Sequence, residues 1–159
     1  MSTNFNRSLT VAEATQRLMQ YCAYQDRCHK EVKQKMRDYG LIPQAQDQIL
    51  GKLIEGNYLN EERFARSFAR GKFNIKHWGK NRIVCELKFR EISSYNIKAA
   101  LTEISEPVYH EKLHWLAEKK LSTIKEKNLY KKKKKLADYL LYRGWESHLV
   151  YEKINELVE

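Results

Sequence analysis

Apolar side chains recur in this chain in three sets, which align when Gly40, Glu91 and Gly144 share one column, 51 and 53 residues apart. In all three sets, apolar residues stand four and eight positions before that column, and one, ten and thirteen positions after it. Spacings of three and four residues place side chains on one face of a helix. A repeat of this length indicates tandem helical units, each of which buries its apolar face partly against its neighbours.

Signals for helix starts and ends divide each repeat into three segments. Pro43 suits a first helical turn, Asn60 suits an N-cap, and Gly144 suits the position after a helix end. The predicted helices are 11–25, 28–39, 43–55, 61–72, 80–91, 95–104, 108–125, 130–143 and 146–157. No segment has the alternating pattern of a strand, so strands are not expected.

The predicted fold is therefore all-α, with three tandem three-helix repeats at residues 1–57, 58–105 and 106–159. The middle repeat is expected to begin with a shorter helix, 61–72, than the first and third repeats. The apolar columns leave open whether the array is compact or is elongated and curved.

The charge of the chain favours a polyanionic partner. Its 159 residues include 30 Lys and Arg against 20 Asp and Glu, a formal net charge of +10. Residues 58–105 hold ten basic and five acidic side chains, so this third of the chain carries +5, half of the surplus. An excess of this kind points to nucleic acid or to an acidic protein surface.

Several classes of protein are not expected. The apolar fraction of 42% is too high for a disordered chain. No uncharged stretch is long enough for a membrane span, no apolar segment follows Arg7 as in a secretory signal, and three cysteines fit reduced thiols in the cytoplasm. Phosphate-loop, zinc-protease, serine-hydrolase and dinucleotide motifs are all missing, so neither an enzyme nor a cofactor is expected.

Two small clusters have the residue types of metal ligands. His110 and His114 are four residues apart and share one face of a predicted helix. Cys22, Cys28 and His29 form the second cluster. Because no third ligand is suitably spaced, we interpret both clusters as packed or solvated side chains and predict no metal site.

The middle repeat carries the strongest candidate for partner binding. Arg63, Arg66 and Arg70 recur at helical spacing and predict a continuous stripe of guanidinium groups on one helix face. The alternative is a solvated face balanced by Glu61, Glu62 and Glu86. An outward Phe89 is either a contact for a partner or a contact between repeats. The predicted partner-binding residues are Arg63, Arg66, Arg70, Lys72, Lys76, Lys80, Arg82 and Phe89.

A second candidate is a run of five lysines at the start of a predicted helix. Its residues are Lys131, Lys132, Lys133, Lys134 and Lys135. The run either contacts phosphates, which would make binding strongly dependent on salt, or forms a frayed, solvated turn. No aromatic residue lies inside the run, so it offers charge without base stacking.

The middle repeat also resembles a known family. Residues 56–66 read GNYLNEERFAR, and Gly79-Lys80-Asn81-Arg82-Ile83 is followed by Glu86-Leu87. This pattern is similar to the RecX signature, GYL-[DN]-[DE]-x-RFA, then a basic stretch with a glycine, then RI-x-x-EL-x-x-KGI. Here Asn57 is inserted, Asn81 stands where proline is frequent, and Arg90-Glu91-Ile92 replaces Lys-Gly-Ile. Weaker similarities to the family at residues 37–41 and 142–145 extend the resemblance over nearly the whole chain after residue 10.

The resemblance implies a small, non-enzymatic regulator that binds the RecA recombinase filament on single-stranded DNA. Members of the family restrain ATP hydrolysis, strand exchange and co-protease activity. The predicted basic residues of the middle repeat would then pair with an acidic recombinase surface or with DNA phosphates. A monomer is the simplest state for a protein that lies in a filament groove.

Two alternatives remain open. Basic three-helix units also suit direct binding to single- or double-stranded DNA, which would be tight without a recombinase and steeply dependent on salt. A structural adaptor whose charge serves solubility would affect no recombination reaction.

Overall fold

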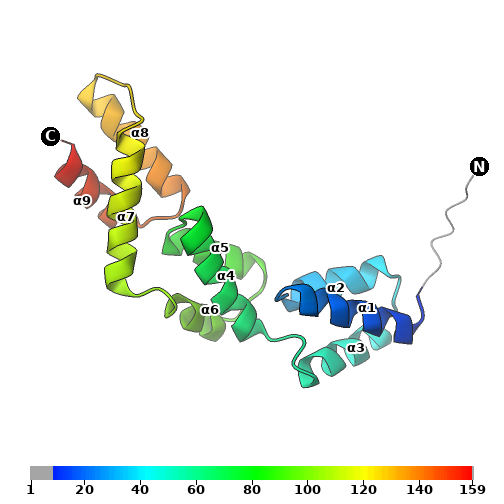
Figure 1. Ribbon diagram of the computed structural model, residues 1–159. Helices are drawn as coiled ribbons and strands as arrows, with labels where there is room; N and C mark the ends of the chain where they lie inside the picture. Colours follow the sequence, from blue (N-terminus) through cyan, green and yellow to red (C-terminus); the bar gives the residue numbers. More distant parts are fainter. Residues whose placement is uncertain (1–8, 159) are drawn as a thin grey trace, which may run out of the picture. The chain divides into compact units, whose positions relative to one another are not determined.

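The computed structural model describes residues 9–158, and helices make up most of this range (Figure 1). Nine helices and no strands lie within these residues, and the predicted all-α class is confirmed. The helices are α1 (Val11–Tyr24), α2 (His29–Asp38), α3 (Pro43–Glu55), α4 (Glu61–Lys76), α5 (Lys80–Phe89), α6 (Ser94–Leu101), α7 (Glu106–Leu121), α8 (Leu129–Tyr142) and α9 (Ser147–Leu157). None of the helices in this range is long and apolar enough to span a membrane.

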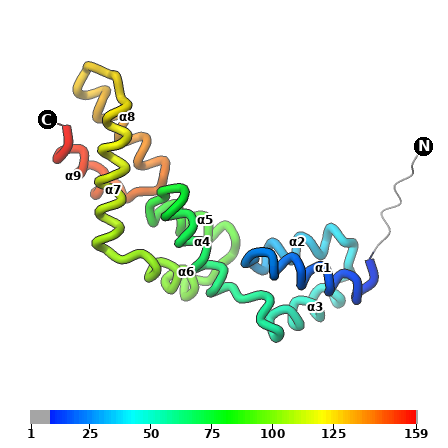
Figure 2. Tube along the Cα trace, viewed as in Figure 1, coloured from blue at the N-terminus to red at the C-terminus, as the bar shows by residue number. Residues whose placement is uncertain are grey.

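The chain divides into two compact units, one ending at Phe64 and the other beginning at Ala65. In the first unit, α1, α2 and α3 pack on one another around a core that includes Leu18, Met36 and Ile49. In the second unit, α7, α8 and α9 pack on one another and α5 packs on α6. Figure 2 shows the course of the backbone through these helices. The limits of the three predicted repeats stay a prediction.

Most helix starts agree with the sequence, whereas several ends do not. α4 continues to Lys76 instead of ending at 72, because the buried Phe73 extends the apolar face of Ala65 and Ala69 by one more turn. The first helix of the middle repeat is therefore not shorter than the others, since α4 and α7 each have 16 residues. That prediction was wrong.

Three further corrections concern helix limits in the second unit. α6 begins at Ser94, because the N-cap is Ser93, whose hydroxyl accepts a hydrogen bond from the Asn96 amide at 3.2 Å. α7 ends at Leu121, four residues before the predicted end. The hydroxyls of Ser122 and Thr123 each donate to a carbonyl three residues earlier, at 2.7 Å, and these bonds compete with a continued helix. α5 likewise ends at Phe89, two residues early.

The column that aligns the repeats marks one recurrent helix ending. Gly40, Glu91 and Gly144 all have a left-handed backbone, with φ of 72°, 60° and 89°. In each case the next amide donates to the carbonyl five residues before it, at 3.2, 3.1 and 3.2 Å. This is the Schellman pattern, which satisfies the last carbonyls of a helix.

A close backbone contact joins the segments 77–82 and 143–145 in the second unit. The Gly79 amide donates to the Arg143 carbonyl at 2.8 Å, and the Asn81 amide donates to the Gly144 carbonyl at 2.9 Å. A Cβ atom at Gly144 would lie 2.2 Å from the Arg82 Cβ, and one at Gly79 would lie 2.5 Å from the Gly144 oxygen. Both positions therefore require glycine.

Buried aromatic rings pack beside this contact. Trp145 stacks on Tyr109, with ring centroids 4.5 Å apart, and its indole N–H donates to the His77 carbonyl at 3.1 Å. The Tyr109 hydroxyl donates to Glu146 and accepts from the Lys80 amide at 2.9 Å. Burial, followed by the Glu146 hydrogen bond, raises the pKa of Tyr109 far above its usual value. This buried network fixes the basic segment around Lys80 and Arg82 against α7 and α9.

Candidate partner-binding surface

Arg63, the first arginine of the predicted stripe, is bound within the first unit. Its Nε donates to Asp26 at 2.7 Å, and its guanidinium also contacts Asn57 and the Tyr58 carbonyl. Asn60 caps α4, as predicted, by accepting from the Arg63 amide at 2.9 Å. The Arg63 side chain therefore fixes the turn that leads into α4.

Arg66 and Arg70 share one carboxylate in the second unit. Each guanidinium lies 3.1 Å from Glu103, and the pKa of that carboxyl is lowered, first by its hydrogen bond from Arg66. Their side chains nevertheless remain 36% and 50% exposed. The predicted uninterrupted stripe is thus divided between separate internal acceptors, Asp26 for Arg63 and Glu103 for the other two.

Lys80 and Arg82 are also engaged internally. The Lys80 ammonium lies 2.6 Å from Glu106 and 4.5 Å from the centre of the Tyr109 ring. Arg82 lies between two rings, with its guanidinium carbon 4.3 Å from the centre of Trp78 and 4.9 Å from that of Tyr142. Both side chains thus connect the start of α5 with residues of α7 and α8.

The other predicted residues of the middle repeat are more accessible. Lys72 lies 5.1 Å from the Trp78 ring centre, and Lys76 is exposed at the end of α4. Phe89 is 69% exposed. Of the acids proposed to balance this face, Glu61 pairs with His29 and Glu86 pairs with Arg90. The stripe arginines and Lys80 also pair with acids that were not proposed, namely Asp26, Glu103 and Glu106.

The five-lysine run forms the first turns of α8. Asn128 caps the helix by accepting from the Lys131 amide at 3.1 Å, so this turn is ordered rather than frayed. Lys134 pairs with Asp138 at 3.0 Å and Lys135 with Glu126 at 3.7 Å. Within residues 9–158, the remaining three lysines have no carboxylate partner.

A third basic region was not predicted from the sequence. It consists of cations and aromatic rings at the facing surfaces of α7 and α8, which we term the α7–α8 strip. Its members are Lys112, Trp115, Lys119, Lys120, Tyr139 and Arg143. The spacing of Lys112, Trp115 and Lys119 within one helix was a usable signal. The approach of Tyr139 and Arg143 from a separate part of the chain could not be predicted from the sequence.

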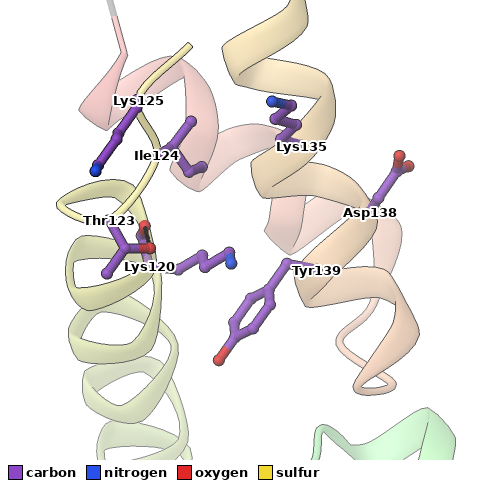
Figure 3. Close-up of a pocket in the computed structure, with 7 residues that line it drawn as sticks. All are labelled: Lys120, Thr123, Ile124, Lys125, Lys135, Asp138 and Tyr139. Carbon is purple, nitrogen blue, oxygen red and sulfur yellow. Dashed lines mark hydrogen bonds between the residues drawn. The ribbon is translucent and has the colours of Figure 1, made fainter.

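Part of this strip lines a hollow of about 500 Å³ between the end of α7 and α8 (Figure 3). Lys120 and Tyr139 point toward one another across it, with the ammonium 4.7 Å from the ring centre. The remaining lining residues are Thr123, Ile124, Lys125, Lys135 and Asp138. Three lysines, from two helices and a loop, thus line the hollow together with one carboxylate.

The two predicted clusters of metal-ligand types are occupied by other contacts. His110 lies 3.5 Å from Glu106, and His114 lies 3.0 Å from Glu118. Cys22 and Cys28 are buried, and burial raises the pKa of the Cys22 thiol. Across the described range 9–158, no three ligand-type side chains are grouped as a metal site would require.

Fold and surface together define a helical repeat protein that carries basic and aromatic residues outside its cores. Two family models match the chain, one for the second three-helix domain of RecX at residues 60–101 and one for the third at 108–154. The chain belongs to the RecX family.

Curated relatives agree with this assignment. Regulatory protein RecX of Clostridioides difficile is 23% identical over 149 residues, which is 92% of this chain and 68% of the relative. The Bacillus cytotoxicus protein of the same name is 24% identical over 94% of this chain and 55% of its own length. The chain thus spans between about half and two thirds of these relatives, and it belongs to a family of regulatory proteins.

Two crystal structures share the fold. RecX from Lactobacillus salivarius superimposes with a TM-score of 0.80 at 26% identity, over 92% of this chain and 96% of that one. A second structure, described as regulatory protein RecX, gives a TM-score of 0.82 at 25% identity, over 92% of this chain and 73% of the other.

Proposed function

We propose that this protein binds the RecA recombinase filament on single-stranded DNA and inhibits its ATP hydrolysis, strand exchange and co-protease activity. The observation that carries this proposal is the match of residues 60–101 and 108–154 to two successive RecX domains. The net charge of +10 supports a polyanionic target. The protein acts by binding rather than by catalysis, as a monomer in the cytoplasm.

The repeat organisation suits a filament. Three units at 1–57, 58–105 and 106–159 would let one chain contact several recombinase subunits. Contacts linked in one chain reinforce one another, because each one raises the effective concentration of the next. Inhibition would follow from blocked extension or blocked subunit turnover.

The contacts divide the predicted residues into three groups. Lys72, Lys76 and Phe89 are accessible enough to meet a partner directly. Arg66 and Arg70 would reach an acidic surface or a phosphate by exchanging Glu103 for it. Arg63, Lys80 and Arg82 would act mainly by holding the surface in shape.

A pair of matched variants tests the role of Arg66 and Arg70. The double variant Arg66→Gln/Arg70→Gln should weaken binding to filaments on single-stranded DNA about tenfold, as expected for the loss of two charge-assisted contacts. Glu103→Gln removes the same internal ion pairs but keeps both arginines, and it should bind at least as tightly as the unmodified protein. Co-sedimentation with filaments gives the affinities.

The two variants also separate a binding role from a structural one. Exposed ion pairs contribute at most about 1 kcal/mol to stability, so both variants should fold. Equal losses of binding in both variants would contradict direct contact by the arginines.

A second candidate function is direct DNA binding by the basic units. Three lysines of the α8 run without carboxylate partners in the described residues favour it. Tight binding to DNA without recombinase, combined with no effect on recombinase reactions, would support this function over the first.

A further inference from the structure

The cations of the α7–α8 strip contact aromatic rings instead of carboxylates. Lys119 lies 4.8 Å from the Trp115 ring centre, and the Arg143 guanidinium lies 3.8 Å from that of Tyr139. Within residues 9–158, no carboxylate forms an ion pair with the four cations of the strip, Lys112, Lys119, Lys120 and Arg143. By contrast, Arg66, Arg70, Lys80 and Arg90 in the same unit all have carboxylate partners.

The positive charge of the strip acts on one neighbouring titratable group, His77. His77 lies against the strip, with its ring centre 5.1 Å from that of Trp115 and its Nδ1 3.1 Å from the Lys112 ammonium. Burial lowers the pKa of His77, and Lys112, Lys119 and Arg143 lower it further. The three cations therefore lie close enough together to act on one imidazole.

The aromatic rings of the strip are accessible. Trp115 is 45% exposed and borders a shallow hollow of about 240 Å³, which Val108, Glu111 and Lys112 also line. Tyr139 is half-buried and borders the larger hollow of Figure 3. Glu111 and Asp138 are the carboxylates at the edges of the two hollows, and Asp138 is already paired with Lys134.

We propose that the α7–α8 strip is a binding surface for single-stranded nucleic acid, with bases stacking on Trp115 and Tyr139. The flexible cations that now cover the rings would turn to the phosphates. Partly exposed rings, combined with cations that have no carboxylate partner in the described residues, are what unstacked bases and a phosphate backbone require. A duplex hides its base faces, and an acidic protein surface would use the charges without needing the rings. The inference deepens the second candidate function, direct DNA binding, by assigning it a surface and a preference for single strands, and it does not depend on the recombinase.

Binding to a fluorescent oligothymidylate, followed by anisotropy over a range of salt concentrations, tests the inference. Trp115→Ala should weaken binding about tenfold, since stacking contributes about 1–3 kcal/mol per base. Trp115→Phe, which keeps a ring, should recover most of the affinity. Full affinity in Trp115→Ala would overturn the inference.

The charges are tested by a matched pair of triple variants. Lys119→Gln/Lys120→Gln/Arg143→Gln should reduce the slope of log K against log salt by about 2, at about 0.7 per phosphate contact. Lys33→Gln/Lys88→Gln/Lys98→Gln removes the same charge at exposed positions elsewhere and should leave most of the slope. Equal changes in the two triple variants would contradict a localised site.

Two further results would overturn the inference. One is binding to duplex DNA as tight as to the single strand. The other is no binding to oligothymidylate at low salt. Because these measurements contain no recombinase, their failure leaves filament inhibition to be judged separately.

Discussion

Glu91 occupies a backbone position that the equivalent sites in the other two repeats give to glycine. Its φ of 60° lies in the left-handed region, as do the values at Gly40 and Gly144. A side chain in this region costs about 1–2 kcal/mol, and glycine avoids that cost at some loss of entropy. The alignment of the three repeats thus places a strained residue at the end of α5.

Replacing this residue tests whether the strain is real. Glu91→Gly should raise the free energy of unfolding by about 0.5–1 kcal/mol, the strain relieved less the added entropy of the unfolded chain. Urea unfolding measures the change. Asn57→Gly, also at φ 60°, relieves less strain because asparagine tolerates this conformation, and it removes the Oδ1 that accepts from Arg63, so it should not raise stability. A destabilised Glu91→Gly variant would show that the side chain makes a compensating contact.

His77 makes folding sensitive to pH. Its pKa is lowered in the folded protein, so below its ordinary value of about 6.5 the unfolded chain binds more protons than the folded one. The free energy of unfolding should therefore fall as the pH drops below about 6.5. The pKa of His29 is lowered too, mainly by burial, and it acts in the same direction.

Removing the imidazole should remove its share of this dependence. His77→Asn keeps a side chain suited to the φ of 59° at this position, together with an acceptor for Lys112. Its loss of unfolding free energy between about pH 7.5 and 5.5 should be smaller than that of the unmodified protein. Thermal unfolding at the two pH values measures it. Equal losses would mean that His77 is not desolvated.

At the scale of elements, helix starts could be predicted from the sequence better than helix ends. Thr10 and Asn60 cap α1 and α4 through bonds to amides three residues on, and such bonds need only local sequence. The end of α4 depends on the burial of Phe73 against Tyr109 and Trp145, which are distant in sequence. Helix ends of this kind depend on tertiary packing, which cannot be predicted from a single sequence.

The candidate surface divides in the same way. The sequence identified Arg63, Arg66 and Arg70 as a charged stripe on one face of a helix, which depends only on spacing. The shared partner of Arg66 and Arg70, Glu103, lies more than 30 residues away in the chain, and no local pattern points to it. The α7–α8 strip was missed because Tyr139 and Arg143 join the residues of α7 from a separate part of the chain.

The contact between segments 77–82 and 143–145 predicts a large effect from a single methyl group. Gly144→Ala should lower the free energy of unfolding by about 2–4 kcal/mol, because the new Cβ would overlap Arg82 and the backbone is left-handed. Gly71→Ala, in α4, has nothing within 4 Å of the added atom and should raise stability by up to about 1 kcal/mol. Chemical unfolding of both variants measures the difference. Equal stabilities would contradict the close contact.

At the scale of the whole molecule, positive charge is distributed in two ways. Around α4 and α5, many cations pair with the protein's own carboxylates, which fixes the shape of the surface. On α7 and α8, several cations contact rings or have no carboxylate partner in the described residues. A protein that acts on a nucleoprotein filament would use the first surface for protein and the second for nucleic acid.

The most direct test of the proposed function is ATP hydrolysis by the cognate RecA on single-stranded DNA, with this protein titrated in below the amount that coats the DNA. Regulation of the filament predicts inhibition at much less than one chain per recombinase subunit. Arg66→Gln/Arg70→Gln should need about tenfold more protein for the same inhibition. Unchanged hydrolysis until the protein coats the DNA would contradict filament regulation and would instead indicate competition for DNA.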